Sequence, residues 1–350
     1  MKVFIINPGA TSTKIAVFEE KEQLGRLTID HPAEDLAHFE KVVDQKDYRK
    51  KLVLEGMAKL SFKPSDFDAV CSRGGLLRHI PSGTYEVTDR VVADVLDPPY
   101  GEHASNLGVL LARDIGSEAG IPAYFVDPVS VDELQPVARV SGFKGMERES
   151  FFHALNHKGM ARRAAERLGR PYEELNLIVL HMGGGVSTAA HCRGRVIDVF
   201  NVKDDGAFSM DRGGSLPTNA LINYCFSGRT KAEVKKEFGS RAGIYSYLGT
   251  KDFLEVQTKA LAGDAECKAM FDAFVYQQIK DIGAMAAVLS MDVDAIVLTG
   301  GMANSETLCA AIEAYVGKIA PVIVLPGEAE MQSLAEGALR VLHGGKPGEY

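Results

Sequence analysis

The chain has 350 residues, 46% of them apolar and 25% charged, so it is long enough for two domains that each bury a core. Its net charge of -8 argues against a general nucleic-acid binder, which needs a basic face for phosphates. The five cysteines form no CxxC pair and no apolar run reaches the roughly 18–20 residues that span a bilayer. We therefore expect a cytoplasmic protein without a signal peptide, disulfides, structural zinc or membrane contact.

Strand-like and helix-like segments alternate along the first half of the chain. A helix is predicted over 33–60 from apolar residues at three- and four-residue spacing. Strands are predicted, in order, at 3–7, at 14–20, in 20–30 after a turn at Gly25, at 67–73 and at 123–127. This alternation is typical of α/β proteins with largely parallel sheets.

The second half repeats the beginning of the first. VFIINPGATSTKIAVF, near the start, resembles LIVLHMGGGVSTAAHC at 177–192, about 174 residues later. Both run from an apolar strand through a glycine-bearing turn into a second strand, which favours two related domains. The alternative is that two common hairpins resemble each other by chance. Further along, the sequence predicts a long helix at 271–289, a buried strand at 293–301 and an amphipathic helix at 330–342.

Three glycine-bearing turns follow predicted strands, at 7–14, 181–185 and 299–304. Glycine lets the backbone approach a phosphate closely, while hydroxyl groups and the ammonium of Lys14 add further donors. One such turn is explained as a tight hairpin, but three at strand ends favour phosphate binding. Neither GxxxxGK[ST] nor GxGxxG occurs, which argues against a P-loop or a dinucleotide fold.

Seven motifs along nearly the whole chain carry a family resemblance. They are INPGATSTKIAVFE (6–19), SRGG (72–75), SFFHALNHK (150–158), HMGGGVSTAAHCRGRVID (181–198), DDGAFSMDRGGSLPT (204–218), LTGGMANS (298–305) and AEGALRVL (335–342). With them the chain resembles the acetokinase family of carboxylate kinases, within the acetate and sugar kinase, heat-shock ATPase and actin superfamily, and specifically the butyrate kinases. Ala10 stands where acetate kinases have a hydroxyl, which leaves a phosphate contact at that position open.

The resemblance implies an α/β fold of two duplicated ribonuclease-H-like domains, of the actin-like ATPase type, that flank an ATP cleft. The first domain is expected at 1–155 together with the C-terminal helix 330–345, and the second at 156–329. A homodimer or higher homo-oligomer is also implied.

The implied reaction is reversible, ATP-dependent phosphorylation of butyrate, or of a branched acid such as isobutyrate, to the acyl phosphate and ADP. Direct in-line transfer needs mainly positioning and neutralisation of charge. By resemblance, Arg73 holds the carboxylate, Arg212 stabilises the transferring phosphoryl group and His153 supports the transition state. A carboxylic acid is already ionised at neutral pH, so Asp127 is assigned to orientation or to a metal-bound water. The alternative for Asp127 is a helix N-cap.

The resemblance also implies sites for ATP and Mg²⁺. The residues implied at the ATP phosphates are Asn7, Thr11, Ser12, Thr13, Lys14, His181, Gly183, Gly184 and Gly185, and those near the adenosine are Gly300, Gly301 and Asn304. Residues 249–252 are a weaker match for the adenine. Mg²⁺ is assigned to Asn7 and Glu330, with Asp127 through water, although Glu328 leaves the choice of glutamate open.

Two other functions stay open from the sequence. One is an acetate or propionate kinase, since the acyl chain would be selected by pocket volume alone. The other is a nucleotide-binding sensor that has lost phosphoryl transfer. A sugar kinase fits less well, because it needs an aspartate base for a hydroxyl group, whereas Arg73 and Arg212 suit an anionic acceptor.

Overall fold

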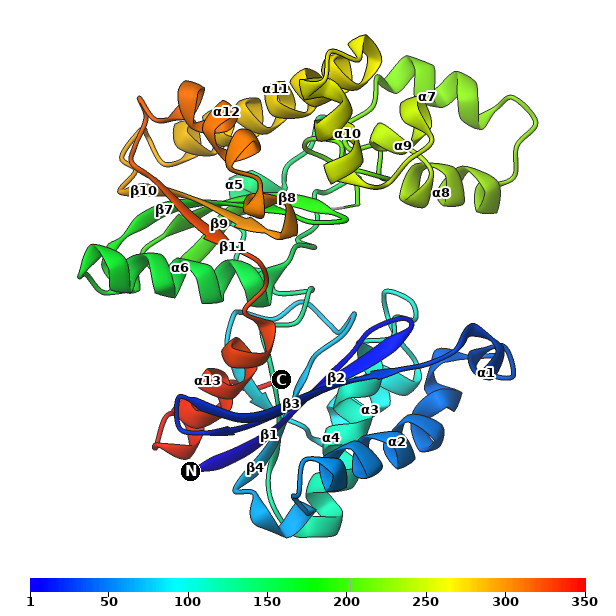
Figure 1. Ribbon diagram of the computed structural model, residues 1–350, viewed down its shortest axis with the longest axis vertical. Coiled ribbons are helices and arrows are strands. Elements are labelled where there is room, and N and C mark those ends of the chain that lie inside the picture. Colours follow the sequence, from blue (N-terminus) through cyan, green and yellow to red (C-terminus); the bar gives the residue numbers. More distant parts are fainter. Residues whose placement is uncertain (202) are drawn as a thin grey trace. The chain divides into compact units, whose positions relative to one another are not determined.

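The computed structural model describes residues 1–201 and 203–350, which divide into two compact units. The first unit comprises Met1–Asp132, Ala154–Gly159 and Ala329–Tyr350, and the second comprises Glu133–His153 and Met160–Glu328. Each unit is built around one mixed β-sheet (Figure 1).

The sheet of the first unit has the strand order β3-β2-β1-β4-β6-β5. Its strands are β1 (Lys2–Pro8), β2 (Ser12–Glu19), β3 (Glu22–Asp30), β4 (Ala69–Arg73), β5 (Thr84–Glu86) and β6 (Ala123–Val126). The strands β1, β4 and β6 are parallel, while β2, β3 and β5 pair antiparallel with their neighbours. The carboxyl ends of β1, β4 and β6 therefore meet at one edge of this sheet.

Helices cover both faces of the first sheet, as Figure 1 shows. One face carries α2 (Lys46–Lys59), α3 (Asp89–Leu96) and α4 (Asn106–Ala119). Here α4 packs on β1 and β4, α2 packs on β2 and β3, and α3 packs against α4. The other face carries α13 (Glu330–Leu342), whose small residues let it approach the sheet closely. A Cβ atom at Gly337 would lie 2.5 Å from a methyl of Val126, so only glycine fits there.

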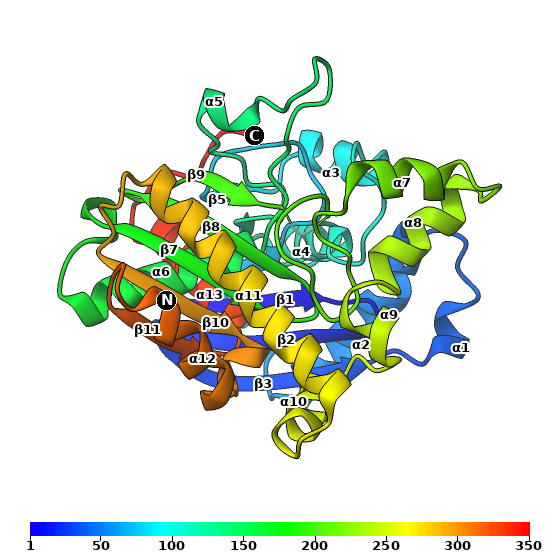
Figure 2. The same ribbon diagram turned by 90° about the horizontal axis from the view of Figure 1, so that it is seen from above.

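The sheet of the second unit has the order β11-β10-β7-β8-β9. Its strands are β7 (Asn176–Met182), β8 (Val186–Cys192), β9 (Arg195–Phe200), β10 (Ala295–Gly300) and β11 (Val322–Pro326). The long helix α11 (Ala265–Val288) crosses one face of this sheet, with α12 (Glu306–Val316) beside it (Figure 2). The part of α6 (Ala154–Leu168) that belongs to this unit lies on the opposite face (Figure 1).

Shorter helices complete the chain. They are α1 (Ala33–Leu36), α5 (Pro136–Arg139), α7 (Thr218–Cys225), α8 (Lys231–Ser240), α9 (Gly243–Leu248), α10 (Phe253–Leu261) and the 3₁₀ turns η1 (Val42–Gln45), η2 (Pro64–Asp66), η3 (Tyr172–Glu174) and η4 (Gly301–Asn304).

The internal duplication is confirmed by topology. In both sheets a three-stranded antiparallel meander is followed by two parallel strands: β3-β2-β1-β4-β6 in one and β9-β8-β7-β10-β11 in the other. The pairing register even shifts at corresponding places, after Val17 in β2 and after Ala190 in β8. These positions agree with the offset of about 174 residues to within one residue.

Three expectations about local structure are wrong. Gly25 does not form a turn, because it lies inside β3 beside the bulge opposite Val17, and the chain turns at Glu20 and Lys21 instead. The segment 33–60 is not one helix but α1, an irregular stretch, η1 and α2. The sheets are mixed rather than largely parallel, because each copy of the repeat contributes an antiparallel meander.

The predicted helix at 330–342 is confirmed as α13, and the one at 271–289 is the greater part of α11. No helix within the described ranges is long and apolar enough to cross a bilayer. The five cysteines, all in described positions, are free thiols.

Candidate active site

In the first unit, the turn between β1 and β2 presents a group of donors without partners. The amide of Gly9 donates to the carbonyl oxygen of Ser12 at 2.7 Å and closes the turn. Within the part of the chain that the structure describes, five donors of this turn bond to no protein group. They are the amides of Ala10 and Thr11, the hydroxyl groups of Thr11 and Ser12, and the ammonium of Lys14. Such a cluster of free donors is suited to a phosphate group.

Thr13 differs from its neighbours because it points into the unit. Its side chain is fully buried, and its hydroxyl lies 2.8 Å from Nε2 of His31 and 3.2 Å from Nη1 of Arg49. Burial and the nearby guanidinium lower the pKa of His31 to about 4, so this histidine is neutral at physiological pH. Thr13 thus supports the turn from below.

The carboxyl ends of β1 and β4 meet the first turn of α13 at a charged cluster. The guanidinium of Arg73 donates to Oε1 of Glu330 at 2.6 Å, and the amide of Asn7 donates to Oε2 of the same carboxylate at 2.7 Å. Both partners of the ion pair are largely buried, with side chains 19% and 12% exposed. The structure thus brings together three of the expected site residues, although Glu330 is more than 250 residues from the other two in the sequence. Arg73 thus already donates to one carboxylate, through a single bond from Nη1.

Asp127 follows β6 in a strained backbone conformation. Its φ of 39° is in the left-handed region, and its side chain is buried. The carboxylate accepts hydrogen bonds from the hydroxyl of Ser82 at 2.7 Å and the amide of Gly83 at 2.8 Å. It is not a helix N-cap, since no described helix begins there. Strain held by two specific bonds is typical of a functional position.

The donor set at Asn7 and Glu330 fits Mg²⁺. Magnesium takes one or two carboxylates and completes its octahedral shell with waters and substrate phosphates. Glu330 supplies one carboxylate, and the amide oxygen of Asn7 accepts no bond from the described chain. Clusters of three or more histidine, cysteine or acidic side chains are absent among the described residues, so a closed all-protein metal cage is not formed there.

In the second unit, two histidines stack at the carboxyl end of β7. The rings of His153 and His181 are 3.9 Å apart and 21° from parallel. His153 Nδ1 lies 2.8 Å from the hydroxyl of Ser187, and His181 Nε2 lies 3.8 Å from a carboxylate oxygen of Glu328. His181 is buried and His153 partly so. Glu328 is therefore in the second unit, beside His181, whereas Glu330 belongs to the first.

The glycine turn after β7 makes room for Arg212. A Cβ atom at Gly185 would lie 2.9 Å from Nη1 of Arg212 and 3.4 Å from Cε1 of His153, so both side chains reach the same glycine. At Gly183 a Cβ atom would lie 3.0 Å from Nε2 of His181. Around Gly184 there is open space. The turn thus brings Arg212, His153 and His181 together around a backbone that is open on one side.

The loop that carries Arg212 is anchored to α11. The amide of Ala207 donates to Oδ2 of Asp281 at 2.7 Å, and the amide of Phe208 donates to Oε1 of Gln277 at 3.1 Å. Burial, reinforced by the like charge of Asp205, raises the pKa of Asp281 to about 7. None of these anchors was singled out from the sequence, where they read as ordinary polar residues of an apolar helix.

The third glycine turn lies beside the second, because β10 pairs with β7 and places Thr299 opposite His181. Gly300 has a φ of 90°, and a Cβ atom there would lie 2.3 Å from the carbonyl oxygen of Met182. Asn304 donates to the carbonyl oxygen of Gly301 at 2.8 Å within η4. Both of these contacts define the turn itself.

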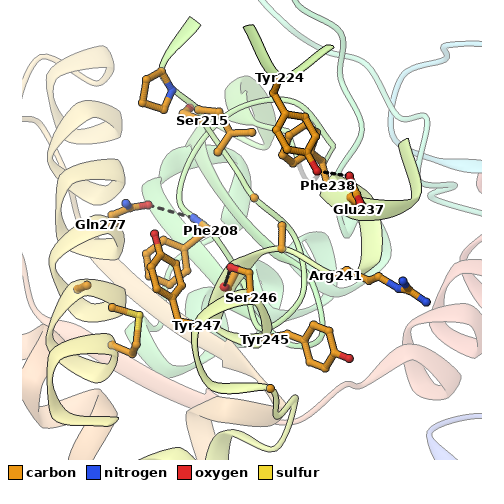
Figure 3. Close-up of a pocket in the computed structure, with 18 residues that line it drawn as sticks. Phe208, Ser215, Tyr224, Glu237, Phe238, Arg241, Tyr245, Ser246, Tyr247 and Gln277 are labelled. Atoms are coloured by element: carbon orange, nitrogen blue, oxygen red, sulfur yellow. Dashed lines mark hydrogen bonds between the residues drawn. The ribbon is translucent and has the colours of Figure 1, made fainter. Parts of the chain in front are cut away.

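A cavity of about 810 Å³ lies next to the Arg212 loop (Figure 3). Its wall is rich in aromatic side chains, among them Phe208, Tyr224, Phe238, Tyr245 and Tyr247. Of the positions expected at a site, only Gly249, from the segment 249–252, lines this cavity. It is therefore distinct from the histidine and glycine cluster of the same unit.

Comparison with known proteins relates the whole chain to carboxylate kinases. A family model described as the Acetokinase family matches residues 143–319. Butyrate kinase 1 of Clostridium acetobutylicum is 46% identical over 345 residues, which cover 98% of this chain and 97% of that protein.

Solved structures agree on the fold. Porphyromonas gingivalis acetate kinase has a TM-score of 0.77 at 20% identity, and a propionate kinase from Francisella tularensis has a TM-score of 0.75 at 16%. Both matches cover 97% of this chain and 99% of the other. At these identities the structural likeness carries the fold alone, and it confirms the fold class expected from the sequence.

Proposed function

Because the chain belongs to the acetokinase family, we propose that it transfers a phosphoryl group from Mg·ATP to a short-chain carboxylate, with butyrate as the main substrate. The observation that carries this proposal is the 46% identity to a butyrate kinase over nearly the full length of both chains. The products are butyryl phosphate and ADP, and the reverse reaction makes ATP.

Arg73 binds the carboxylate substrate, which accepts the phosphoryl group. A carboxylate is ionised at neutral pH, so its oxygen attacks the γ-phosphorus without a general base. The new bond joins that oxygen to phosphorus, and the bond between phosphorus and the β,γ-bridging oxygen breaks, with ADP as the leaving group. Arg73 orients the acceptor through its guanidinium, whose planar fork suits a carboxylate, and in the structure its Nη1 donates to the carboxylate of Glu330. Asp127, fixed by Ser82 and Gly83, orients the reactants and would help to hold Mg²⁺ through water.

The transferring phosphoryl group is stabilised by Arg212, His153 and His181 of the second unit. Charge spreads over its three equatorial oxygens in the transition state, so fixed cationic and hydrogen-bonding groups lower the barrier. Arg212 supplies the positive charge over Gly185, and His153, held by Ser187, donates from the adjacent position. His181 stacks against His153 and fixes its ring.

We assign ATP and its metal to residues from both halves of the chain. The phosphates bind the donors of 7–14 and of 181–185, and the adenosine lies near Gly300, Gly301 and Asn304. Asn7 and Glu330 would hold Mg²⁺, with Asp127 through water. When bound, Mg²⁺ neutralises charge on the phosphates.

We also propose the domain limits 1–155 with 330–345, and 156–329, a homodimer or larger homo-oligomer, and a cytoplasmic location. The division of the chain into two compact units, one of which includes the C-terminal helix, supports two domains, but it places Glu133–His153 in the second unit rather than the first. Use of ATP supports the location.

The proposal is tested by trapping acyl phosphate with hydroxylamine in the presence of Mg·ATP. The acids compared are acetate, propionate, butyrate, isobutyrate and isovalerate. We expect hydroxamate with a maximum at four carbons, since each methylene in an apolar pocket is worth about 1–3 kcal/mol. A maximum at acetate or propionate would assign the chain to the other carboxylate kinases. ATP binding without hydroxamate from any acid would make it a nucleotide-binding sensor.

A further inference from the structure

A fully buried guanidinium lies directly beneath the β1–β2 turn. Arg49 of α2 is 0% exposed, and its Nη atoms donate to the carbonyl oxygens of Gly9 at 2.8 Å and Ala10 at 3.0 Å. Its remaining bonds go to the hydroxyl of Thr13, to the carbonyl oxygen of Ser12 at 3.5 Å and to Oε1 of Gln45. All of these acceptors are neutral, and no carboxylate of the described chain pairs with Arg49.

An unpaired cation in the interior is costly, because burial removes its hydration. The same burial lowers the pKa of Arg49 to about 10, which still leaves the group charged at neutral pH. A protein that keeps such a group gains by binding an anion nearby. The turn that Arg49 binds is the one that presents free donors at its exposed residues Ala10 and Thr11.

Peptide geometry links Arg49 to those donors. The carbonyl of Gly9 and the amide of Ala10 belong to one trans peptide, so they point in opposite directions. The same holds for the carbonyl of Ala10 and the amide of Thr11. Because Arg49 binds both carbonyls, both amides point away from it, and neither has a partner in the described chain. Two successive amides on one side form a concave anion site.

We propose that Arg49 is a positioning residue for a nucleotide phosphate at this turn. Its guanidinium turns the amides of Ala10 and Thr11 toward the phosphate, and the bound phosphate gives the buried charge the anionic partner that the free protein lacks. This inference rests on the proposed function, which assigns ATP phosphates to residues 7–14. It adds a residue that never touches the ligand.

Calorimetric titration of Arg49→Met and Arg49→Lys with ATP and with adenosine tests the inference. Loss of a charge-assisted hydrogen-bonding group predicts that Arg49→Met binds ATP about 10- to 100-fold more weakly. Adenosine, which has no phosphate, keeps its affinity. Arg49→Lys keeps the charge but not the fork, so its loss is smaller. Lys59→Met, at the exposed far end of α2, removes the same charge and leaves ATP affinity unchanged.

Two results would overturn the inference. One is a folded Arg49→Met protein that binds ATP as tightly as the wild type. The other is equal weakening of ATP and adenosine, which indicates general damage to the unit.

A measurement on the wild-type protein covers the case in which Arg49→Met does not fold. Amide NMR should show slower hydrogen exchange at Ala10 and Thr11 when ATP binds, and no change at either amide contradicts the inference. The proposed function fails separately, if the wild type binds ATP but makes no acyl phosphate from any acid of the panel.

Discussion

At the scale of single residues, Glu330 links the residue assigned to the acceptor with the residue assigned to the metal. Its carboxylate binds both Arg73, assigned to the acceptor, and Asn7, assigned to the metal. Glu328 is only two residues away, but it lies beside His181 and its side chain is 42% exposed. The sequence left the choice between these glutamates open, because nothing in the spacing says which one faces Asn7. The contacts favour Glu330.

Glu330→Gln should therefore weaken the apparent affinity of the enzyme for Mg²⁺. Replacing a metal-binding carboxylate, or a group that orients one, costs about 10- to 100-fold in metal affinity. The Mg²⁺ concentration that gives half-maximal rate, measured at saturating butyrate, should rise by that factor. Glu328→Gln is the matched comparison and should shift it less than threefold. An equal shift in both variants would contradict the assignment of the metal to Glu330.

Because Arg212 is assigned to the phosphoryl group rather than to the acceptor, its loss should lower kcat. Arg212→Ala should lower kcat by about 10³–10⁵, the range for an arginine that stabilises a transferring phosphoryl group. ATP affinity should be mostly retained, because the glycine turns and the donors of 7–14 remain. Arg229→Ala, a half-exposed arginine on a neighbouring loop, serves as the control in the same assay. A loss of kcat below tenfold would remove Arg212 from the mechanism.

The sequence indicates a role for Arg73 and Arg212 but not for Arg49. Arg73 and Arg212 stand beside glycine pairs in recognisable motifs, whereas Arg49 stands in the charged run KDYRKK. Nothing in that run separates the one buried arginine from the less buried residues around it. Its role depends on contacts to a turn 36 to 40 residues away, which only the folded chain provides.

At the scale of elements, α11 anchors the loop that carries Arg212. Gln277 and Asp281 are one turn apart on this helix and accept bonds from two successive amides, of Phe208 and Ala207. The helix itself was predicted from its apolar residues. Its anchoring function was not, because hydrogen bonds to a distant backbone leave no periodic signal.

The raised pKa of Asp281 has a measurable consequence for stability. Between pH about 4 and about 7 the folded protein holds this proton and the unfolded chain does not. The contribution of Asp281 to the free energy of unfolding therefore falls as the pH rises through this range. Asp281→Asn cannot ionise, so its stability relative to wild type should increase with pH, by up to about 1.4 kcal/mol per pH unit.

Urea unfolding at pH 5, 6, 7 and 8 measures this difference. Asp272→Asn, exposed on the same helix, should give a small difference that does not follow pH in this way. A difference between Asp281→Asn and wild type that stays constant from pH 5 to pH 8 would show that Asp281 does not titrate in this range.

Two errors in the sequence-based prediction also concern single helices or strands. The sequence predicts a turn at Gly25, but this glycine lies beside a bulge inside β3. The segment 33–60 has helical spacing on average, yet only tertiary packing decides that its middle is irregular. Both cases concern where an element begins or ends.

At the scale of the whole molecule, the duplication was the most predictable feature. The repeat of the hairpin at 177–192 was visible in the sequence, and the two sheets repeat the same topology. The expectation of largely parallel sheets failed for the same reason, since each repeated hairpin is antiparallel. The repeated turns at 7–14 and 181–185 therefore end equivalent strands, and both are assigned to phosphates.

Direct transfer to a carboxylate oxygen is the central claim, and isotope transfer tests it most directly. Butyrate labelled with ¹⁸O in both carboxylate oxygens is incubated with the wild-type protein, Mg·ATP and hydroxylamine, and the released phosphate is examined by ³¹P NMR. Attack by the carboxylate on phosphorus predicts one ¹⁸O atom in each phosphate, because hydroxylamine cleaves the acyl phosphate at carbon. Phosphate without ¹⁸O would mean that ATP is hydrolysed by water, which would contradict the proposed reaction.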